Sequence, residues 1–298
     1  MRNAALDIGS NSILLYIDEN GKGIYDAGEI TKLGVELSQT KKLSEKSMKD
    51  SLNVIKKFVE VCKENNVENI YAIGTMALRS ATNSADFIKT VKNETGISIE
   101  IISGENEARL AYIAASKTIN NDDSVKMVID IGGCSTEFIC GKGQQILRSE
   151  SLDLGILKVS NDIILRQSLN ENDYTEVEYN LEKSLHNLKM PDFDYLIGVG
   201  GSITNLASVK LGLESYNAEK INEMRLEKKD IKLLLTLFGL MTQSERENIK
   251  GLQKGRASTI IGGAAISLAV LNKFNKNYFT VSVYGLRHGL IMDKLKMK

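Results

Sequence analysis

Ala-Leu-Asp-Ile-Gly-Ser-Asn-Ser at residues 5–12 and Val-Ile-Asp-Ile-Gly-Gly-Cys-Ser-Thr at residues 128–136 are two versions of one phrase. In each, an apolar run ends in an acid, Asp7 or Asp130, and glycine follows two positions later. The two acids lie 123 residues apart. Each phrase then resumes as β-rich sequence, which predicts a strand, a tight turn and a returning strand.

A second pair of phrases repeats at nearly the same spacing. Tyr-Ala-Ile-Gly-Thr at residues 71–75 is answered by Leu-Ile-Gly-Val-Gly-Gly-Ser at residues 196–202. Phrases that match in order at one offset indicate two copies of one α/β unit. We therefore expect an α/β fold of two duplicated domains, residues 1–120 and 121–298, divided at the polar stretch 120–124.

Helical patterns lie between the phrases. The clearest covers residues 44–65, where apolar side chains recur at helical spacing after a Ser-Glu start. Alternation of strands and helices predicts that each domain opens with an antiparallel strand pair and then crosses over to parallel strands. The acidic residues 170–189 are expected to form an exposed helix, closed by Pro191.

The composition describes a chain long enough to bury a sizeable core. Its 298 residues are 42% hydrophobic, which suits two domains of ordinary size. Lys plus Arg and Asp plus Glu both number 38. The chain therefore has no net positive charge that would attract nucleic acid, and a polyanion would have to be bound by a local basic patch.

The compartment is indicated by the cysteines and by the N-terminal residues. Cys62, Cys134 and Cys140 cannot all pair with one another, and they lack the spacing and accompanying histidines of a zinc site. Asp7 interrupts any signal-peptide core, and the longest apolar stretch, residues 260–271, is too short to span a bilayer. We expect a cytoplasmic protein with no membrane or nucleic-acid partner.

Residues 250–298 contain nine basic residues and a single acid, Asp293. Two interpretations are open: solvated surface with helix C-termini, or a face that binds a polyanion. On the second interpretation, Lys273 and Lys276 would help to hold long chains.

Each Asp-x-Gly turn offers groups suited to a phosphate. Glycine lets the backbone approach closely, and the N–H groups of the turn, with nearby hydroxyl and carboxylate groups, face the ligand. Two such turns facing each other across a cleft would clamp a phosphate; the alternative is a pair of ordinary hairpin turns. The glycine-rich residues 198–204 precede an apparent helix at residues 205–211, so their amides would meet an anion at a helix N-terminus.

Residues 101–110 place Ser103, Glu105 and Glu107 at the mouth of a helix. Composition alone favours an ordinary helix start, in which Ser103 is the N-cap and the acids are stabilised by the helix dipole.

Six motifs, taken in order, resemble the exopolyphosphatase / guanosine pentaphosphate phosphohydrolase (Ppx/GppA) family. They span nearly the whole chain, and their order is far more specific than any one of them. The resemblance implies two duplicated actin-like, ribonuclease H-like domains with an active-site cleft between them. The motifs are DIGSNS (residues 7–12), GTMALRSATN (74–83), ISGENEARL (102–110), DIGGCSTE (130–137), GVGGS (198–202) and SVYGLRHG (282–289).

The resemblance implies that Glu107 activates the attacking water and that Asp130 and Glu137 hold Mg²⁺ near the terminal phosphate. Phosphoryl transfer needs alignment, a metal ion and positive charge more than a strong nucleophile, and one glutamate can deprotonate the water. Glu105 is the alternative if the alignment slips by two residues. The expected phosphate-binding residues are Ser10, Asn11, Arg79, Gly132, Gly133, Ser135, Gly200, Gly201, Ser202 and Arg256.

Several positions depart from the family pattern. Cys134 stands where a third glycine is usual, so its side chain would either crowd the phosphate or point into the core. Asn106 replaces a common glutamate, and His288 replaces the usual glutamate of the closing motif. Arg256 lies in a segment that resembles one usually reading Arg-Ala-Asp. Both histidines, His186 and His288, are expected to be incidental surface or interface residues.

The function that the resemblance implies is that of an exopolyphosphatase, a homodimer that uses Mg²⁺ to release terminal phosphate from inorganic polyphosphate. The chain's length resembles that of the short, two-domain members, which favours polyphosphate over the alternative substrate, guanosine pentaphosphate (pppGpp). A kinase of the same superfamily is disfavoured by the motif around Glu107. A sensor that binds polyphosphate or an alarmone without catalysis is disfavoured because Glu107, Asp130 and Glu137 are all retained.

Overall fold

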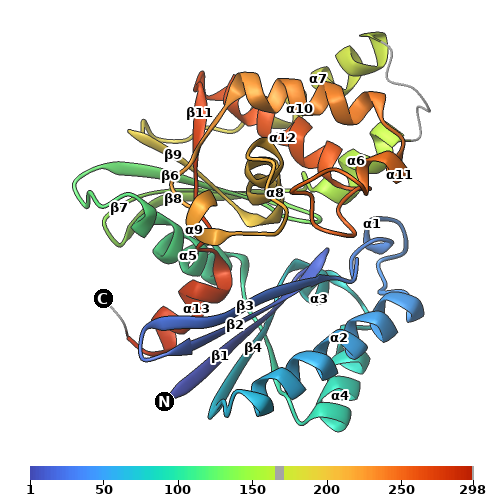
Figure 1. Cartoon of the computed structure of the whole chain (residues 1–298), viewed down its shortest axis with the longest axis vertical. Helices are drawn as coiled ribbons and strands as arrows, with labels where there is room; N and C mark the ends of the chain where they lie inside the picture. Colours follow the sequence, from blue (N-terminus) through green and yellow to red (C-terminus); the bar gives the residue numbers. More distant parts are fainter. Residues whose placement is uncertain (165–170, 297–298) are drawn as a thin grey trace. The chain divides into compact units, whose positions relative to one another are not determined.

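The computed structural model describes residues 1–164 and 171–296 and divides the chain into two compact units (Figure 1). The first unit combines Met1–Ala114 with Leu286–Lys298, and the second is Ala115–Gly285. The chain therefore leaves the first unit, completes the second, and returns. The expected second domain, residues 121–298, included this returning segment, and that part of the prediction is wrong. The apolar residues of a helix do not indicate which sheet it will cover.

The sheet of the first unit has the strand order β3-β2-β1-β4-β5. The first three strands are antiparallel neighbours, whereas β4 and β5 run parallel to β1. This confirms the predicted antiparallel opening followed by a crossover. The strands are β1 (Arg2–Ile8), β2 (Ser12–Glu19), β3 (Lys22–Ile30), β4 (Asn69–Gly74) and β5 (Ile99–Ile101).

Helices cover both faces of this sheet because successive residues of β1 point to opposite sides (Figure 1). Ala4 and Leu6 belong to the larger apolar core with α2 and α4, while Ala5 belongs to a smaller one with α5 and α13. Ser44 caps α2 by accepting a hydrogen bond from the Ser47 amide, as its sequence predicted. The helices of the unit are α1 (Leu37–Thr40), α2 (Glu45–Glu64), α3 (Met76–Ser80), α4 (Ser84–Thr95), α5 (Gly104–Ala115) and α13 (Leu286–Lys294).

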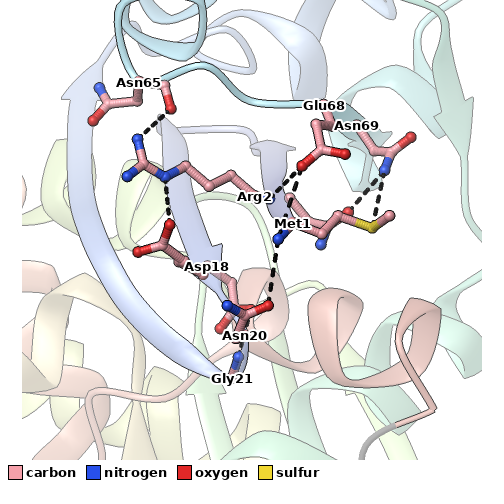
Figure 2. A network of polar contacts seen from close by, with 10 residues as sticks. Met1, Arg2, Asp18, Asn20, Gly21, Asn65, Glu68 and Asn69 are labelled. Carbon is pink, nitrogen blue, oxygen red and sulfur yellow. Dashed lines mark hydrogen bonds and ion pairs between the residues drawn. The ribbon is translucent and has the colours of Figure 1, made fainter.

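A polar network fixes the start of β1, at the opposite end of the strand from Asp7 (Figure 2). The Arg2 guanidinium donates to Glu19 Oε1 on β2 at 2.9 Å and to the Asn65 carbonyl after α2 at 2.7 Å. The Arg2 amide donates to Glu68 Oε1 at 3.2 Å. These bonds join β1 to β2 and to the loop that leads into β4.

The returning helix α13 is held by an ion pair and by an aromatic contact. Arg287 donates twice to Asp26, with both distances 2.8 Å, and His288 Nε2 lies 3.6 Å from the same carboxylate. Burial favours the neutral form of Asp26, but Arg287 and His288 outweigh it and lower its pKa to about 2. His288 is 4% exposed and packs on Tyr16 at 4.3 Å, so of the two expected positions, surface or interface, the surface is wrong for His288. His186 is exposed as expected.

The second unit repeats the same plan in a sheet ordered β10-β11-β9-β6-β7-β8. Strands β6, β7 and β8 are antiparallel, and β9 and β11 continue parallel to β6. The predicted duplication is confirmed. The strands are β6 (Val125–Ile131), β7 (Thr136–Lys142), β8 (Gln145–Leu152), β9 (Tyr195–Val199), β10 (Arg225–Glu227) and β11 (Tyr278–Val281).

The long apolar stretch of the sequence forms α12, whose residues 260–271 are all buried. Throughout the described residues, none of the helices has the length and apolar character needed to cross a bilayer. The acidic segment forms α7, which is partly buried; its residue 170 lies outside the described residues. The helices of the second unit are the 3₁₀ turn η1 (Ser116–Thr118), α6 (Ile156–Ile164), α7 (Glu171–Leu185), α8 (Gly200–Lys210), α9 (Ala218–Ile221), α10 (Lys228–Leu240), α11 (Gln243–Arg246) and α12 (Ile260–Lys273).

The basic residues of the C-terminal region do not form one free surface. Lys273 donates to the His186 carbonyl at 2.9 Å, and Lys276 donates to the Phe193 carbonyl at 3.3 Å while lying over the Phe193 ring. Arg287, in the first unit, is paired with Asp26. These side chains are held by contacts within their own units, which favours the structural interpretation of the patch.

Candidate active site

The turn between β1 and β2 is closed by a hydrogen bond from the Gly9 amide to the Ser12 carbonyl at 3.0 Å. Asn11, in this turn, is 4% exposed, and its side-chain nitrogen and oxygen have no hydrogen-bond partner among the described residues. A buried amide left unsatisfied costs about 1–3 kcal/mol. A polar ligand or an ordered water that reaches this turn would supply the missing bonds.

A loop that no sequence motif indicated, residues 31–34, is hydrogen-bonded to this turn. The Thr31 and Lys32 amides donate to the Asn11 carbonyl at 3.1 and 3.0 Å, and the Gly34 amide donates to the Ser10 carbonyl at 2.8 Å. Lys32 adopts a positive φ of 51°, which is uncommon outside glycine. Backbone hydrogen bonds of this kind leave no pattern in the sequence, so the loop could not be predicted. The loop brings Lys32 next to the turn.

Arg79 and Glu107 form an ion pair in the first unit. Arg79 lies in the last turn of α3 and donates to Glu107 Oε2 at 3.1 Å and to the Ile102 carbonyl at 2.8 Å. Glu107 lies in the first turn of α5, where the Ser103 hydroxyl accepts a hydrogen bond from the Asn106 amide at 3.2 Å. The start of α5 thus has the predicted serine cap as well as the carboxylate.

The environment of Glu107 changes its acidity. Burial raises the pKa of Glu107, and Arg79 opposes the rise by charge attraction and by its hydrogen bond without cancelling it. A raised pKa makes a carboxylate a better proton acceptor. Glu105, two residues earlier, is exposed. Of the two candidates, Glu107 has the environment of a general base.

The first unit connects its turn to this ion pair through the backbone. The Thr75 amide donates to the Ile8 carbonyl at 3.3 Å, and the Arg79 amide donates to the Thr75 carbonyl at 2.9 Å. The end of β1 and the helix that carries Arg79 are therefore fixed to each other by two successive bonds.

Asp130 and Glu137 are directly opposite partners across β6 and β7. Glu137 is 7% exposed and accepts a hydrogen bond from the Ser151 hydroxyl at 3.0 Å. The turn between the strands is closed by the Gly132 amide, which donates to the Ser135 carbonyl at 2.9 Å. Two carboxylates facing each other across a strand pair repel, and a cation between or beside them removes the repulsion.

Glycine at position 200 brings the end of β9 and the start of α8 close to Asp130. Gly200 has a positive φ of 84°, and a Cβ atom there would lie 2.6 Å from Asp130 Oδ1. Both observations require glycine. Helix α8 begins at Gly200 itself, five residues before the expected start at 205. The glycines therefore form the first helical turn.

Arg256 lies against the next glycine of this turn. A Cβ atom on Gly201 would lie 1.9 Å from Arg256 Nη2. Arg256 is 6% exposed, and its side chain donates to Gln253 Oε1 at 3.2 Å. Burial lowers the pKa of Arg256 to about 10, so the guanidinium is still charged at neutral pH. No carboxylate within the described residues pairs with it.

The side chains of Cys134 and Ser202 are packed inside the second unit. Cys134 packs against the apolar core of the second unit, which answers the question of whether it crowds the turn. Ser202 is 2% exposed and its hydroxyl, buried beside Gly263, has no partner in the described part of the chain. Gly133 accepts a hydrogen bond from the Leu157 amide at 2.9 Å through its carbonyl.

The predicted site residues thus lie in two groups in each unit. In the first unit these are the turn of Ser10 and Asn11 and the Arg79–Glu107 pair. In the second unit Asp130, Glu137 and Gly132 gather at the β6–β7 turn, with Gly200, Gly201 and Arg256 at the start of α8.

The fold is that of a duplicated α/β protein, in which the antiparallel opening strands of each sheet meet at a turn of an acid and glycine. The chain belongs to the Ppx/GppA phosphatase family, whose model matches residues 18–298.

Three relatives illustrate the similarity. The chain is 34% identical over 317 residues to a bifunctional 3-dehydroquinate synthase/phosphatase of Fusobacterium nucleatum, and the match covers 99% of this chain but only 47% of that protein. The crystal structure of the Aquifex aeolicus Ppx/GppA family member is 32% identical with a TM-score of 0.81, covering 99% and 98% of the two chains. An exopolyphosphatase from Cytophaga hutchinsonii is 27% identical with a TM-score of 0.82, covering 99% and 98%.

Proposed function

We propose that this phosphatase is an exopolyphosphatase, which hydrolyses the terminal phosphoanhydride bond of inorganic polyphosphate. The observation that carries the proposal is the half-buried Glu107, whose pKa is raised and whose side chain is paired with Arg79. A carboxylate of this kind suits a general base that takes a proton from water. The similarity to the Cytophaga hutchinsonii exopolyphosphatase supports the choice of substrate.

Each group has a role in this proposal. Glu107 orients the attacking water and accepts its proton, and Arg79 keeps Glu107 in place and meets the negative charge of the phosphoryl group. Asn11, with its unused buried amide, and Arg256, with its unpaired cation, bind phosphate oxygens. The turn backbone at Gly132 and Gly133 and the side chains of Ser10 and Ser135 complete the phosphate contacts, together with the backbone amides of Gly200, Gly201 and Ser202.

Asp130 and Glu137 fit a Mg²⁺ ion. Within the described residues, no cluster of three or more His, Cys, Asp or Glu side chains offers a complete set of metal ligands. Mg²⁺ often uses only one or two carboxylates and takes its other ligands from water and substrate phosphates. The facing carboxylates of Asp130 and Glu137 match that requirement. The ion would supply charge neutralisation to the phosphate oxygens.

Phosphate release from purified protein tests the function. With long-chain polyphosphate, we expect release that requires Mg²⁺ and that stops when a chelator is added. Parallel assays with pppGpp and with ATP distinguish the substrates, because all three carry a terminal phosphoanhydride but only two carry a nucleoside. If pppGpp is hydrolysed faster than polyphosphate, pppGpp is the better candidate for the substrate. Tight binding of polyphosphate without release of phosphate would indicate a sensor.

Arg79 should control the pH dependence of the reaction. Replacing Arg79 by glutamine removes the positive charge that lowers the pKa of Glu107, so burial alone acts and the pKa rises further. The acid limb of kcat/KM should therefore move to higher pH, because Glu107 must be ionised to accept a proton. A pH profile of phosphate release measures this limb. A limb that stays in place or moves to lower pH would show that Glu107 is not the titrating group.

A further inference from the structure

The loop that carries Arg256 is fixed from both sides by buried side chains outside the predicted motifs. This loop, residues 251–259, connects the segment after α11 to α12. A buried cation without a carboxylate partner has no ion pair to hold its side chain. Its position against Gly201 must therefore be set by the loop and by what holds the loop.

Asn205 fixes the loop on the N-terminal side of Arg256. Its Nδ2 donates to the Gly201 carbonyl at 2.8 Å, and its Oδ1 accepts a hydrogen bond from the Gln253 amide at 2.8 Å. Gln253 Oε1 in turn accepts the hydrogen bond from Arg256 Nε. Asn205 is 3% exposed. The glycine turn and the Arg256 guanidinium are thus joined in a closed ring of contacts through Asn205 and Gln253.

Arg246 fixes the loop on the other side. Its Nε donates to the Ala257 carbonyl at 2.8 Å, and its Nη1 donates to the carbonyls of Phe238 and Met241 at 2.7 and 2.8 Å. Arg246 is 5% exposed. Phe238 lies in the last turn of α10 and Met241 is its C-cap. Neither carbonyl has a partner within the helix. Arg246 therefore anchors the residue next to Arg256 to a rigid helix end.

We infer that Asn205 and Arg246 are positioning residues that hold the Arg256 guanidinium against Gly201, so that its free N–H groups meet a phosphate of the substrate. This inference rests on the proposed function only in that it requires a bound phosphate chain. The alternative is that Asn205 and Arg246 only stabilise the second unit. In that case their replacement lowers stability, and any effect on phosphate affinity is the same with and without Arg256.

A double-mutant cycle separates these interpretations. The affinity of the purified full chain for tripolyphosphate is measured by calorimetry for the wild type, N205A, R256A and N205A/R256A. We expect N205A to weaken binding about tenfold in the wild type and less than about twofold once Arg256 is absent, because residues that act through one group are not additive. N272A is the matched control, since Asn272 is an asparagine of the same unit on α12, and it should leave affinity unchanged.

Equal loss of affinity on N205A in both backgrounds would overturn the inference. R246K keeps the charge of Arg246 but one ammonium group cannot reproduce the directional bonds of the guanidinium, so it should weaken binding in the same non-additive manner. It also keeps the test valid if N205A fails to fold, which its melting temperature reveals. If the wild type binds no tripolyphosphate, both the proposed function and this inference are wrong. If the losses of affinity in the double-mutant cycle are additive, the inference alone is wrong.

Discussion

Replacing Glu107 by glutamine should lower the rate of phosphate release by about 10²–10⁴-fold, which is the usual contribution of a general base. Glutamine keeps the shape of the side chain and an oxygen that accepts a hydrogen bond, but it cannot take a proton from water. Affinity for the phosphate chain should persist, because the proposed phosphate contacts lie on other residues and one negative charge near a polyanion has been removed.

The same substitution should not destabilise the protein. The pKa of Glu107 is raised in the folded state, so its ionised form is disfavoured there. Such a group contributes stability below its unfolded pKa and loses that contribution as the pH rises through its folded pKa. At pH 7 the melting temperature of E107Q should equal or exceed that of the wild type, and the difference should shrink below about pH 4.

Glu105→Gln is the matched control for this experiment, because Glu105 is on the same helical turn but exposed. It should retain nearly full turnover. If Glu105→Gln abolishes phosphate release while Glu107→Gln retains it, the assignment of the base is wrong by two residues.

Replacing Gly289 by alanine should unfold the first unit far more easily. A Cβ atom at this position would lie 1.9 Å from the Leu110 carbonyl oxygen, which is a backbone atom of α5 and cannot turn aside. Overpacking of this severity costs about 3 kcal/mol, although alanine within a helix ordinarily stabilises by about 1 kcal/mol relative to glycine. The net cost of about 2 kcal/mol should lower the melting temperature by roughly 4–8 °C.

Gly285→Ala supplies the comparison, because a Cβ atom on Gly285 would meet nothing within 4 Å. Its melting temperature should stay close to that of the wild type. A similar, small change for both variants would show that α13 does not pack tightly on α5 in solution.

The duplicated fold could be predicted because its signal is local and repeated. An apolar run, an acid and glycines specify a strand and a turn at Asp7, and the same run specifies them again at Asp130. The return of α13 to the first sheet could not be predicted. Its apolar residues Leu286 and Leu290 would suit either sheet, and only packing against Ala5 and its neighbours decides the matter.

The residues of the candidate site were predicted to different degrees. Glu107 and Arg79 were named from motifs, but their ion pair joins two helices, and neither segment alone indicates it. Asn205 and Arg246 were missed because their partners are mostly backbone groups. A backbone carbonyl is present at every position, so a side chain that binds one has no complementary residue to reveal it in the sequence.

The return of α13 to the first unit also affects the order in which the protein is made on the ribosome. The sheet around Ala5 and Ile73 is translated early, but Leu290 and Ile291, which cover its second apolar face, are translated after the whole second unit. At ~5–20 residues per second this delay lasts about ten to thirty seconds. During that time only α5 is available to cover this apolar face, so the part that α13 covers stays exposed, the kind of surface that chaperones bind. The first unit completes its folding only after Gly285 has been added.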